Sequence, residues 1–207
     1  GNGAGINLAL KKCKTKFAIY SDIDVKFKDN FIKKFLQLTR KVKNFTILVP
    51  NHGNLNFKNK IIEKYDGEAS MMLFNVSKLK KVDFFDEKYF LYYEEIDLLH
   101  RLKKNNLKSF FIGNLKIKHI RASSIENESL RIQNLRLWHY MWSMFYFYRK
   151  NFNYFYALKK TITYLIKDIF MFFVYLLIFN KKNTFKRFYR IYGLVCSMIF
   201  LKSFLRL

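Results

Sequence analysis

Short apolar runs alternate with amphipathic segments along the first 120 residues. The runs have the length and composition of buried strands, and they occupy residues 17–20, 45–49, 68–74, 110–112 and 116–120. Apolar side chains at helical spacing predict helices at residues 29–38 and 91–104, and a Gly-rich segment leads into another helix within residues 1–12. Because strands alternate with helices, the pattern predicts an α/β fold built around one sheet.

The pattern changes after a polar loop at residues 123–129. Residues 161–179 form an apolar run of nineteen positions in which only Lys167 and Asp168 are charged, close to the shortest length that spans a bilayer. Basic residues follow at once, and a shorter apolar run occupies residues 191–201. The pattern therefore predicts a set of apolar, aromatic helices with basic flanks in this part of the chain.

The two parts of the chain also differ in net charge. Residues 131–207 contain 14 Lys and Arg against the single acid Asp168, so they carry +13 of the net charge of +24. Aromatic helices with basic flanks are typical of segments that lie on or dip into an anionic membrane face. Spanning helices and the core helices of a soluble bundle remain alternatives. We predict an α/β domain at residues 1–130 and a membrane-associated helical region at 131–207.

Composition limits the class of protein and its partners. Apolar residues make up 51% of the chain, which is enough for a packed core and unlike a disordered protein. So large a positive charge calls for a negatively charged partner: nucleic acid, anionic lipid or a phosphorylated substrate. Cys13 and Cys196 are far apart and lack metal-type spacing, which favours structural thiols in a reducing compartment.

Two short clusters of carboxylates are conspicuous in so basic a chain. The first, Asp22 and Asp24, follows the strand predicted at residues 17–20. Two carboxylates two positions apart, at the carboxyl end of a sheet strand, can hold a divalent cation whose shell is completed by substrate phosphates. The alternative is ordinary turn chemistry, for which Asp is also well suited.

The second cluster opens the helix predicted at residues 91–104. Its apolar stripe contains Leu91, Glu95, Leu98, Leu99 and Leu102. Glu95 therefore heads the apolar face, while Glu94, Asp97 and Arg101 form a neighbouring polar stripe suited to mutual pairing. The helix dipole favours an ionised carboxylate near the amino terminus, as a general base requires. Alternatively, these acids only complement the dipole and pair with nearby Lys and Arg.

Taken in order, these segments resemble family 2 glycosyltransferases, particularly their rhamnosyltransferase-like members. Residues 2–9 (Asn-Gly-Ala-Gly-Ile-Asn-Leu-Ala) are similar to the family's first loop and helix, and residues 17–24 to its Asp-x-Asp strand. Residues 67–74 are similar to the small-residue strand before the acceptor site, and residues 82–98 to the run Gly-x-Phe-Asp-Glu-x-Phe-Phe-x-Tyr-x-Glu-Asp-x-Asp-Leu. The family usually has Asp where this chain has Glu95, and Gly where Val82-Asp83 stands.

The resemblance implies a GT-A (Rossmann-like) mixed sheet with flanking helices, and it implies roles for particular residues. Asp24 and Asp22 would bind Mg²⁺ or Mn²⁺, with His119 completing the metal shell; a lone His is also commonly structural. Asn2, Gly3, Asn7 and Asp22 would contact the nucleotide-sugar donor. Glu95 would be the catalytic base, and Glu94, Asp97 and Arg101 would support the acceptor site.

The resemblance implies an inverting glycosyltransferase, and the basic, aromatic tail would hold it at the cytoplasmic face of the cell membrane. It would transfer a sugar from a nucleotide-sugar to a cell-surface polysaccharide or lipid-linked acceptor. Because the chain opens inside a loop and without Met, we expect the first strands of the GT-A sheet to be missing from it. A basic nucleic-acid-binding protein, which we do not favour, and an inactive fragment of a membrane-associated protein are the alternatives.

Overall fold

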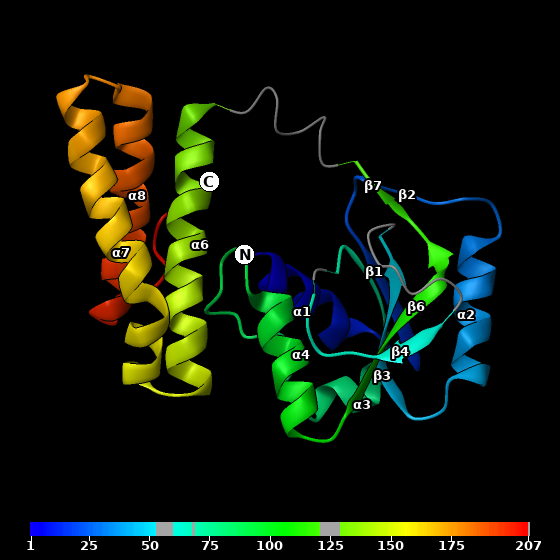
Figure 1. Ribbon diagram of the computed structural model, residues 1–207. Helices are drawn as coiled ribbons and strands as arrows, with labels where there is room; N and C mark the ends of the chain where they lie inside the picture. The colour runs from blue at the N-terminus through cyan, green and yellow to red at the C-terminus, as the bar shows by residue number, and fades with distance from the viewer. Residues whose placement is uncertain (53–59, 68, 121–128, 207) are drawn as a thin grey trace. The chain divides into compact units, whose positions relative to one another are not determined.

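The computed structural model describes residues 1–52, 60–67, 69–120 and 129–206. The chain divides into two compact units, which are described separately. An α/β unit comprises Ala4–Asp86 and Glu95–Glu126, and a helical unit comprises Gly1–Gly3, Glu87–Glu94 and Asn127–Leu207 (Figure 1).

A mixed five-stranded sheet forms the centre of the α/β unit, with the strand order β1-β5-β3-β6-β4. The strands are β1 (Phe17–Ser21), β3 (Phe45–Asn51), β4 (Ile61–Glu63), β5 (Met71–Asn75) and β6 (Lys108–Lys116). Only β3 and β6 pair in parallel, and the other neighbours are antiparallel. As a result β1, β3 and β6 all run in the same direction. A second, two-stranded sheet pairs β2 (Val25–Lys26) with β7 (Lys118–His119).

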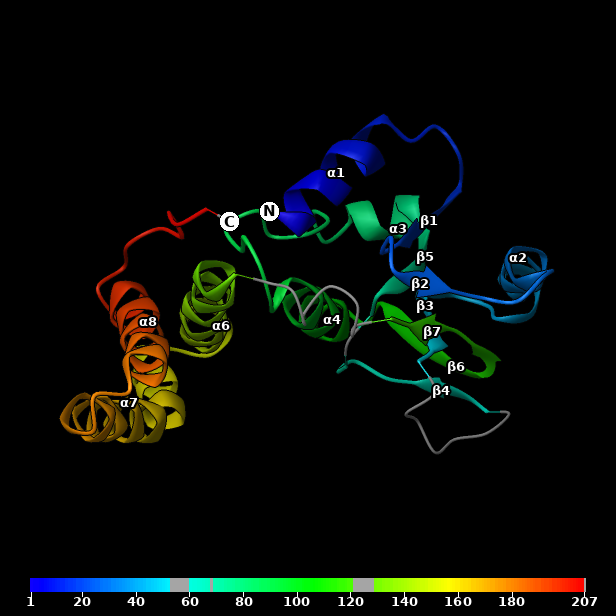
Figure 2. The same ribbon diagram turned by 90° about the horizontal axis from the view of Figure 1, so that it is seen from above.

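Helices cover both faces of the large sheet. The described helices of this unit are α1 (Asn2–Lys12), α2 (Phe31–Lys41), α3 (Val76–Lys80) and α4 (Glu94–Lys104), of which only the first residues of α1 and α4 count with the helical unit. In β5 the side chains alternate, so that Met72 and Phe74 pack with α1, α3 and α4, whereas Met71 and Leu73 pack with α2. Figure 2 shows α2 on one side of the strands and α4 on the other. The strands read as continuous apolar runs because both faces are buried.

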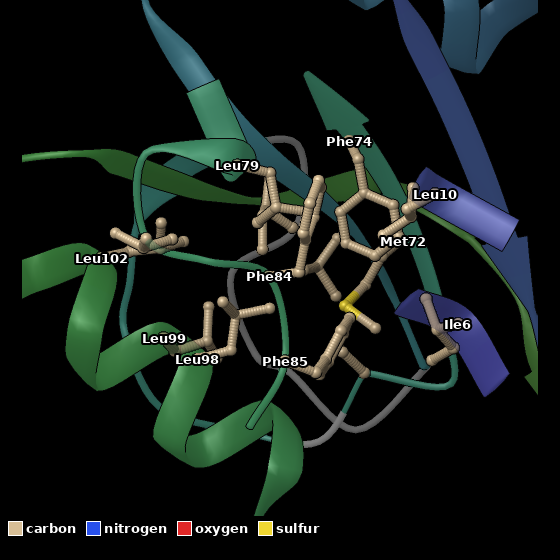
Figure 3. Packing of buried hydrophobic residues seen from close by; sticks show 14 of the residues in the cluster. Ile6, Leu10, Met72, Phe74, Leu79, Phe84, Phe85, Leu98, Leu99 and Leu102 are labelled. Atoms are coloured by element: carbon tan, nitrogen blue, oxygen red, sulfur yellow. The ribbon is translucent and has the colours of Figure 1, made fainter. Parts of the chain in front are cut away.

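The core between the sheet and α4 is formed by large side chains (Figure 3). Leu98, Leu99 and Leu102 of α4 are fully buried against the sheet. Phe84 and Phe85, from the loop after α3, fill the space between α4 and Phe74. The amphipathic pattern of α4 is therefore the direct cause of its packing.

The α/β class predicted from the sequence is confirmed, but the helix predicted at residues 91–104 is wrong at its start. The helix begins at Glu94, since Tyr92 and Tyr93 adopt φ of 67° and 69°, which no α-helix accommodates. Leu91 therefore does not belong to the apolar stripe of α4. Strand β4 was not anticipated, and the loop predicted at residues 123–129 lies almost entirely outside the described residues, as does Glu68.

The described part of the helical unit contains three long helices: α6 (Leu130–Asn151), α7 (Tyr154–Leu177) and α8 (Lys181–Met198). The side chains of Ser129, Asn153 and Asn180 cap their amino termini by accepting hydrogen bonds from backbone N–H groups. Gly193 allows α8 to approach α6 closely, because a Cβ at this position would lie 2.2 Å from the carbonyl oxygen of Trp138. In the part of the chain that the structure describes, no helix has both the length and the apolarity to cross a membrane.

Candidate active site

One edge of the large sheet collects polar side chains from several strands. Because β1, β3 and β6 run in the same direction, their carboxyl ends lie at this edge, together with the start of β5. Asp22 and Asp24 follow β1, His52 follows β3, and Ser70 precedes β5. Ligands of open α/β sheets bind at the carboxyl ends of the strands, so this edge is the candidate site.

Asp22 is fixed at the point where β1 ends. Its backbone N–H donates to the carbonyl of Ser70 at 2.8 Å, which extends the β1–β5 pairing by one residue. The phenol of Tyr20 donates to the Asp22 carboxylate, and the Asp22 carbonyl accepts from the N–H of Val25 at 3.3 Å, closing a tight turn. The carboxylate of Asp22 is therefore oriented by the strand that precedes it and by the turn that follows.

The same turn brings Asp24 beside the segment that contains His119. Strand β2 begins at Val25, whose partner in the ladder is His119, and the carbonyl of Asp24 accepts from the N–H of Ile120 at 3.0 Å. The backbone thus places His119 next to the Asp22–Asp24 turn although nearly a hundred residues separate them. The side chain of His119 lies outside the described structure.

His52 and Ser70 belong to this edge, and sequence reasoning gave them no role. The Ser70 hydroxyl lies 3.4 Å from Nε2 of His52, and the Ser70 carbonyl holds Asp22 as described above. Before them, Asn51 is buried and donates from Nδ2 to the carbonyl of Gly113 at 3.2 Å, which ties the end of β3 to β6. Sequence reasoning could have found His52 and Ser70 from their positions, which directly follow and directly precede a buried strand.

Glu95 lies at the same end of the sheet. Helix α4 packs along the sheet, and only residues 105–107 connect it to the start of β6, so its first turn lies where β6 ends (Figure 1). The Glu95 side chain is half-buried, while Leu98 and Leu99 on the following turn are fully buried. Glu95 shares the helical stripe of Leu98 and Leu99, as predicted, but it is more exposed than Glu94 and Asp97, which are buried.

Asp97 and Arg101 form a buried brace. Nε of Arg101 donates to the Asp97 carboxylate at 2.7 Å, so their predicted pairing is confirmed. The Arg101 guanidinium also donates to the carbonyl of Phe84 at 2.6 Å and to that of Val82. Asp97 is completely buried, as is most of Glu94. This polar stripe therefore faces the protein interior and shapes the loop at residues 82–85.

Asn7 has a comparable role on the other side of that loop. Its Nδ2 donates to the carbonyl of Phe85 at 2.8 Å, and its Oδ1 accepts from the N–H of Phe85 at 3.0 Å. The buried amide thus pairs with the backbone as a neighbouring strand would. Asn2 and Gly3, the other residues predicted to contact a donor, belong to the helical unit, where the N–H of Asn2 donates to the carbonyl of Phe90 at 3.3 Å.

The two aspartates suit a cation that a phosphorylated ligand shares with the protein. Mg²⁺ commonly takes one or two carboxylates from a protein and completes its shell with substrate phosphates and water, which matches what Asp22 and Asp24 supply. Among the described residues, no three His, Cys, Asp or Glu side chains gather to hold a metal ion. The carboxylates at this edge therefore suit a Mg²⁺ or Mn²⁺ ion that is shared with a phosphorylated ligand.

A hollow of about 460 Å³ lies at the opposite end of the sheet, where β1 and β3 begin. Lys16, Lys43 and Lys78 are among the residues that line it. It is separate from the aspartates, and we assign it no role in the candidate site.

Comparison with known proteins assigns no family to this chain, so the candidate site is argued from its geometry. No protein-family model matches the chain, and a search of curated proteins finds no matching relative.

Proposed function

We propose that this chain is an inverting glycosyltransferase that transfers a sugar from a nucleotide-sugar donor to a glycan or lipid-linked acceptor. One observation carries the proposal. The Asp22–Asp24 turn leaves β1 at the edge where β1, β3 and β6 end, and it is held there by Ser70 and by the strand that contains His119. This arrangement suits a cation and a diphosphate bound at the carboxyl edge of the sheet.

The arrangement of elements supports a GT-A domain of family 2. Asp83 stands at the position where that family usually has Gly, and it adopts φ of 56°, in the left-handed region that Gly occupies freely and Asp more readily than most residues. Phe84, which follows, has φ of 54°. Arg101 and Asn7 hold this loop from two sides, so the chain keeps the conformation without the glycine.

Three carboxylates at this end of the sheet have tasks in such a reaction. Asp24 and Asp22 hold the Mg²⁺ or Mn²⁺, which when bound offsets the negative charge on the departing nucleoside diphosphate. Glu95 accepts the proton of the acceptor hydroxyl. The hydroxyl oxygen forms its bond to the anomeric carbon while the bond from that carbon to the diphosphate oxygen breaks, and attack from the opposite face inverts the configuration.

The remaining predicted site residues hold the loop beside the site in place. Asp97 and Arg101 set the loop that precedes the acidic end of α4, and Asn7 sets its far end at Phe85. We assign these side chains to positioning rather than to contact with a reacting atom, because their polar atoms already bind the protein backbone and one another.

Release of nucleoside diphosphate from a panel of nucleotide-sugars tests the proposal, using the full chain with Mn²⁺ and a lipid-linked acceptor. Glu95→Gln should slow the transfer about 100-fold or more, the contribution of a general base, while donor binding persists. Asp24→Ala should abolish both binding and transfer. Glu63→Gln is the matched control, because this exposed glutamate of β4 lies outside the site, and it should leave the rate unchanged. Full activity of Asp24→Ala or Glu95→Gln would refute the site.

A further inference from the structure

Helix α7 buries two polar side chains together with apolar ones such as Ala157 against the other helices, and it exposes large apolar side chains on its outer side. Thr161 and Asp168 have no more than 1% of their surface exposed, whereas Phe170 and Leu177 expose 66% and 77%. An amphipathic helix packed in water instead has an outer side of polar residues. Since burying Asp168 costs free energy and exposing large apolar side chains gains none, this orientation suits an apolar environment outside the helix.

The exposed apolar residues follow one face along the whole of α7. Members of the stripe recur at spacings of three, four or seven positions, with two adjacent pairs that widen it, as on one face of a helix. The outer stripe consists of Phe155, Ile162, Ile166, Ile169, Phe170, Phe173, Leu176 and Leu177. Ile178 and Phe179, with 61% and 88% exposed, continue it beyond the end of the helix. Within the helix, from Phe155 to Leu177, the stripe thus extends over about 33 Å, from the rise of 1.5 Å per residue.

The buried polar side chains of α7 have hydrogen-bond partners within the helical unit. The Asp168 carboxylate accepts from Arg187 at 2.6 Å and from Arg190 at 2.7 Å, both on α8. The hydroxyl of Thr161 donates to the carbonyl of Ala157 at 2.8 Å. The ion pairs with α8 and the packing of Ala157 in the apolar cluster of the unit together hold this side of α7 inwards, and so leave the stripe on the outside.

The charges around the stripe are positive. Asp168 is the one acid in residues 131–207, and it is buried and paired, so every acidic charge of this region is already compensated. Lys160 and Lys167 are exposed on α7, and Lys181 and Lys182 are exposed at the start of α8, directly after the stripe. A surface that combines apolar bulk with positive charge complements a bilayer that contains anionic lipid.

We propose that the outer stripe of α7 is a membrane-binding surface, on which the helix lies along the face of an anionic phospholipid bilayer. The aromatic and aliphatic side chains enter the boundary between headgroups and acyl chains, and the lysines contact lipid phosphates. A second copy of this chain is a poorer occupant, because two such faces would bring like charges together. The proposal concerns the helical unit and holds whether or not the α/β unit is a transferase.

Vesicle co-sedimentation of the full chain tests the proposal. Vesicles of equal parts phosphatidylcholine and phosphatidylglycerol should bind the chain, and pure phosphatidylcholine should bind it more weakly. Phe173→Gln should weaken binding about tenfold, the value of burying one Phe side chain. Tyr164→Gln is the matched control: Tyr164 is exposed on α7 outside the stripe, and its replacement also leaves the charge unchanged.

Lys181→Gln combined with Lys182→Gln tests the electrostatic part. It should lower binding to the anionic vesicles about fivefold per lysine, with little effect on the neutral ones. Near-ultraviolet circular dichroism of Trp138 and Trp142, buried in α6, verifies that each variant is folded. Equal vesicle binding by wild type and Phe173→Gln would overturn the proposal. A dimer that Phe173→Gln dissociates without changing vesicle binding would overturn it too, and would assign the stripe to a protein interface.

Discussion

Nε of Arg101 lies 2.7 Å from the carboxylate of Asp97, one helical turn earlier on α4, and the carboxylate is completely buried. A buried carboxylate needs compensation by charge and hydrogen bonds. Arg101 provides it and also reaches the carbonyls of Val82 and Phe84, so one guanidinium connects α4 to the loop in which Asp83 and Phe84 adopt positive φ. The acidic helix and the unusual loop are therefore a single structural arrangement.

Arg101→Ala should destabilise the α/β unit by about 3–5 kcal/mol, because it leaves Asp97 buried without its cation. Arg101→Lys should be milder but still costly, since an ammonium cannot serve the carboxylate and two carbonyls with the geometry of a guanidinium. Urea denaturation measures both. Lys103→Ala, an exposed position on the same helix, should change the free energy of unfolding by about 0.5 kcal/mol at most. An unchanged urea midpoint for Arg101→Ala would contradict the stabilising role of the Asp97–Arg101 pair.

Asn7→Ala should cost about 2–3 kcal/mol, because it leaves the N–H and carbonyl groups of Phe85 without their partners in the core. The same measurement on Asn114→Ala provides the comparison, since Asn114 is exposed on β6 and should be nearly neutral. If the two variants unfold at the same urea concentration, the side chain of Asn7 does not support the loop.

Two glycines should respond to alanine in opposite ways. Gly193→Ala should destabilise the helical unit by about 3 kcal/mol, because its Cβ would lie 2.2 Å from the carbonyl oxygen of Trp138. Gly5→Ala should stabilise the α/β unit by about 0.5–1 kcal/mol, since Gly5 is within α1 and the added methyl group would have no neighbour within 4 Å. Thermal unfolding of each variant distinguishes these effects, and a stable Gly193→Ala protein would contradict the close approach of α6 and α8.

His139 makes the helical unit sensitive to acid. Burial lowers its pKa from 6.5 to about 4, and its Nδ1 lies 3.2 Å from the hydroxyl of Ser203. Between these two pH values the unfolded chain binds a proton that the folded one does not, so stability should fall by about 3 kcal/mol as the pH drops from 6.5 to 4. Urea midpoints of wild type and His139→Gln over this range measure the effect. Parallel pH profiles for the two proteins would exclude His139 as the cause.

Local sequence was sufficient for several features. The apolar run at residues 17–20 predicted β1, and the acids directly after it had to lie at the end of a strand, which is where Asp22 and Asp24 are found. The spacing of Leu98, Leu99 and Leu102 correctly gave the buried face of α4. In these cases the side-chain period and the adjacent residues contain all the information, because strands and helices repeat at different intervals.

The start of α4 shows the limit of periodicity. Leu91 fits the spacing of the apolar stripe, but Tyr92 and Tyr93 take positive φ and the chain is not helical there. The carbonyl of Leu91 instead accepts a hydrogen bond from the hydroxyl of Ser143, more than fifty residues away. Nothing adjacent to Leu91 in the sequence specifies that contact.

The sequence by itself determined which residues share a strand or a helical face, and it marked Asp22, Asp24 and Glu95 as carboxylates at element ends. Only the tertiary structure decided which faces point inwards. It turned Asp168 towards Arg187 and Arg190, and it left the opposite side of α7, with its outer stripe of apolar side chains, exposed. The physical reason is that periodicity reports the relation between neighbours along one element, whereas burial depends on partners supplied by distant elements.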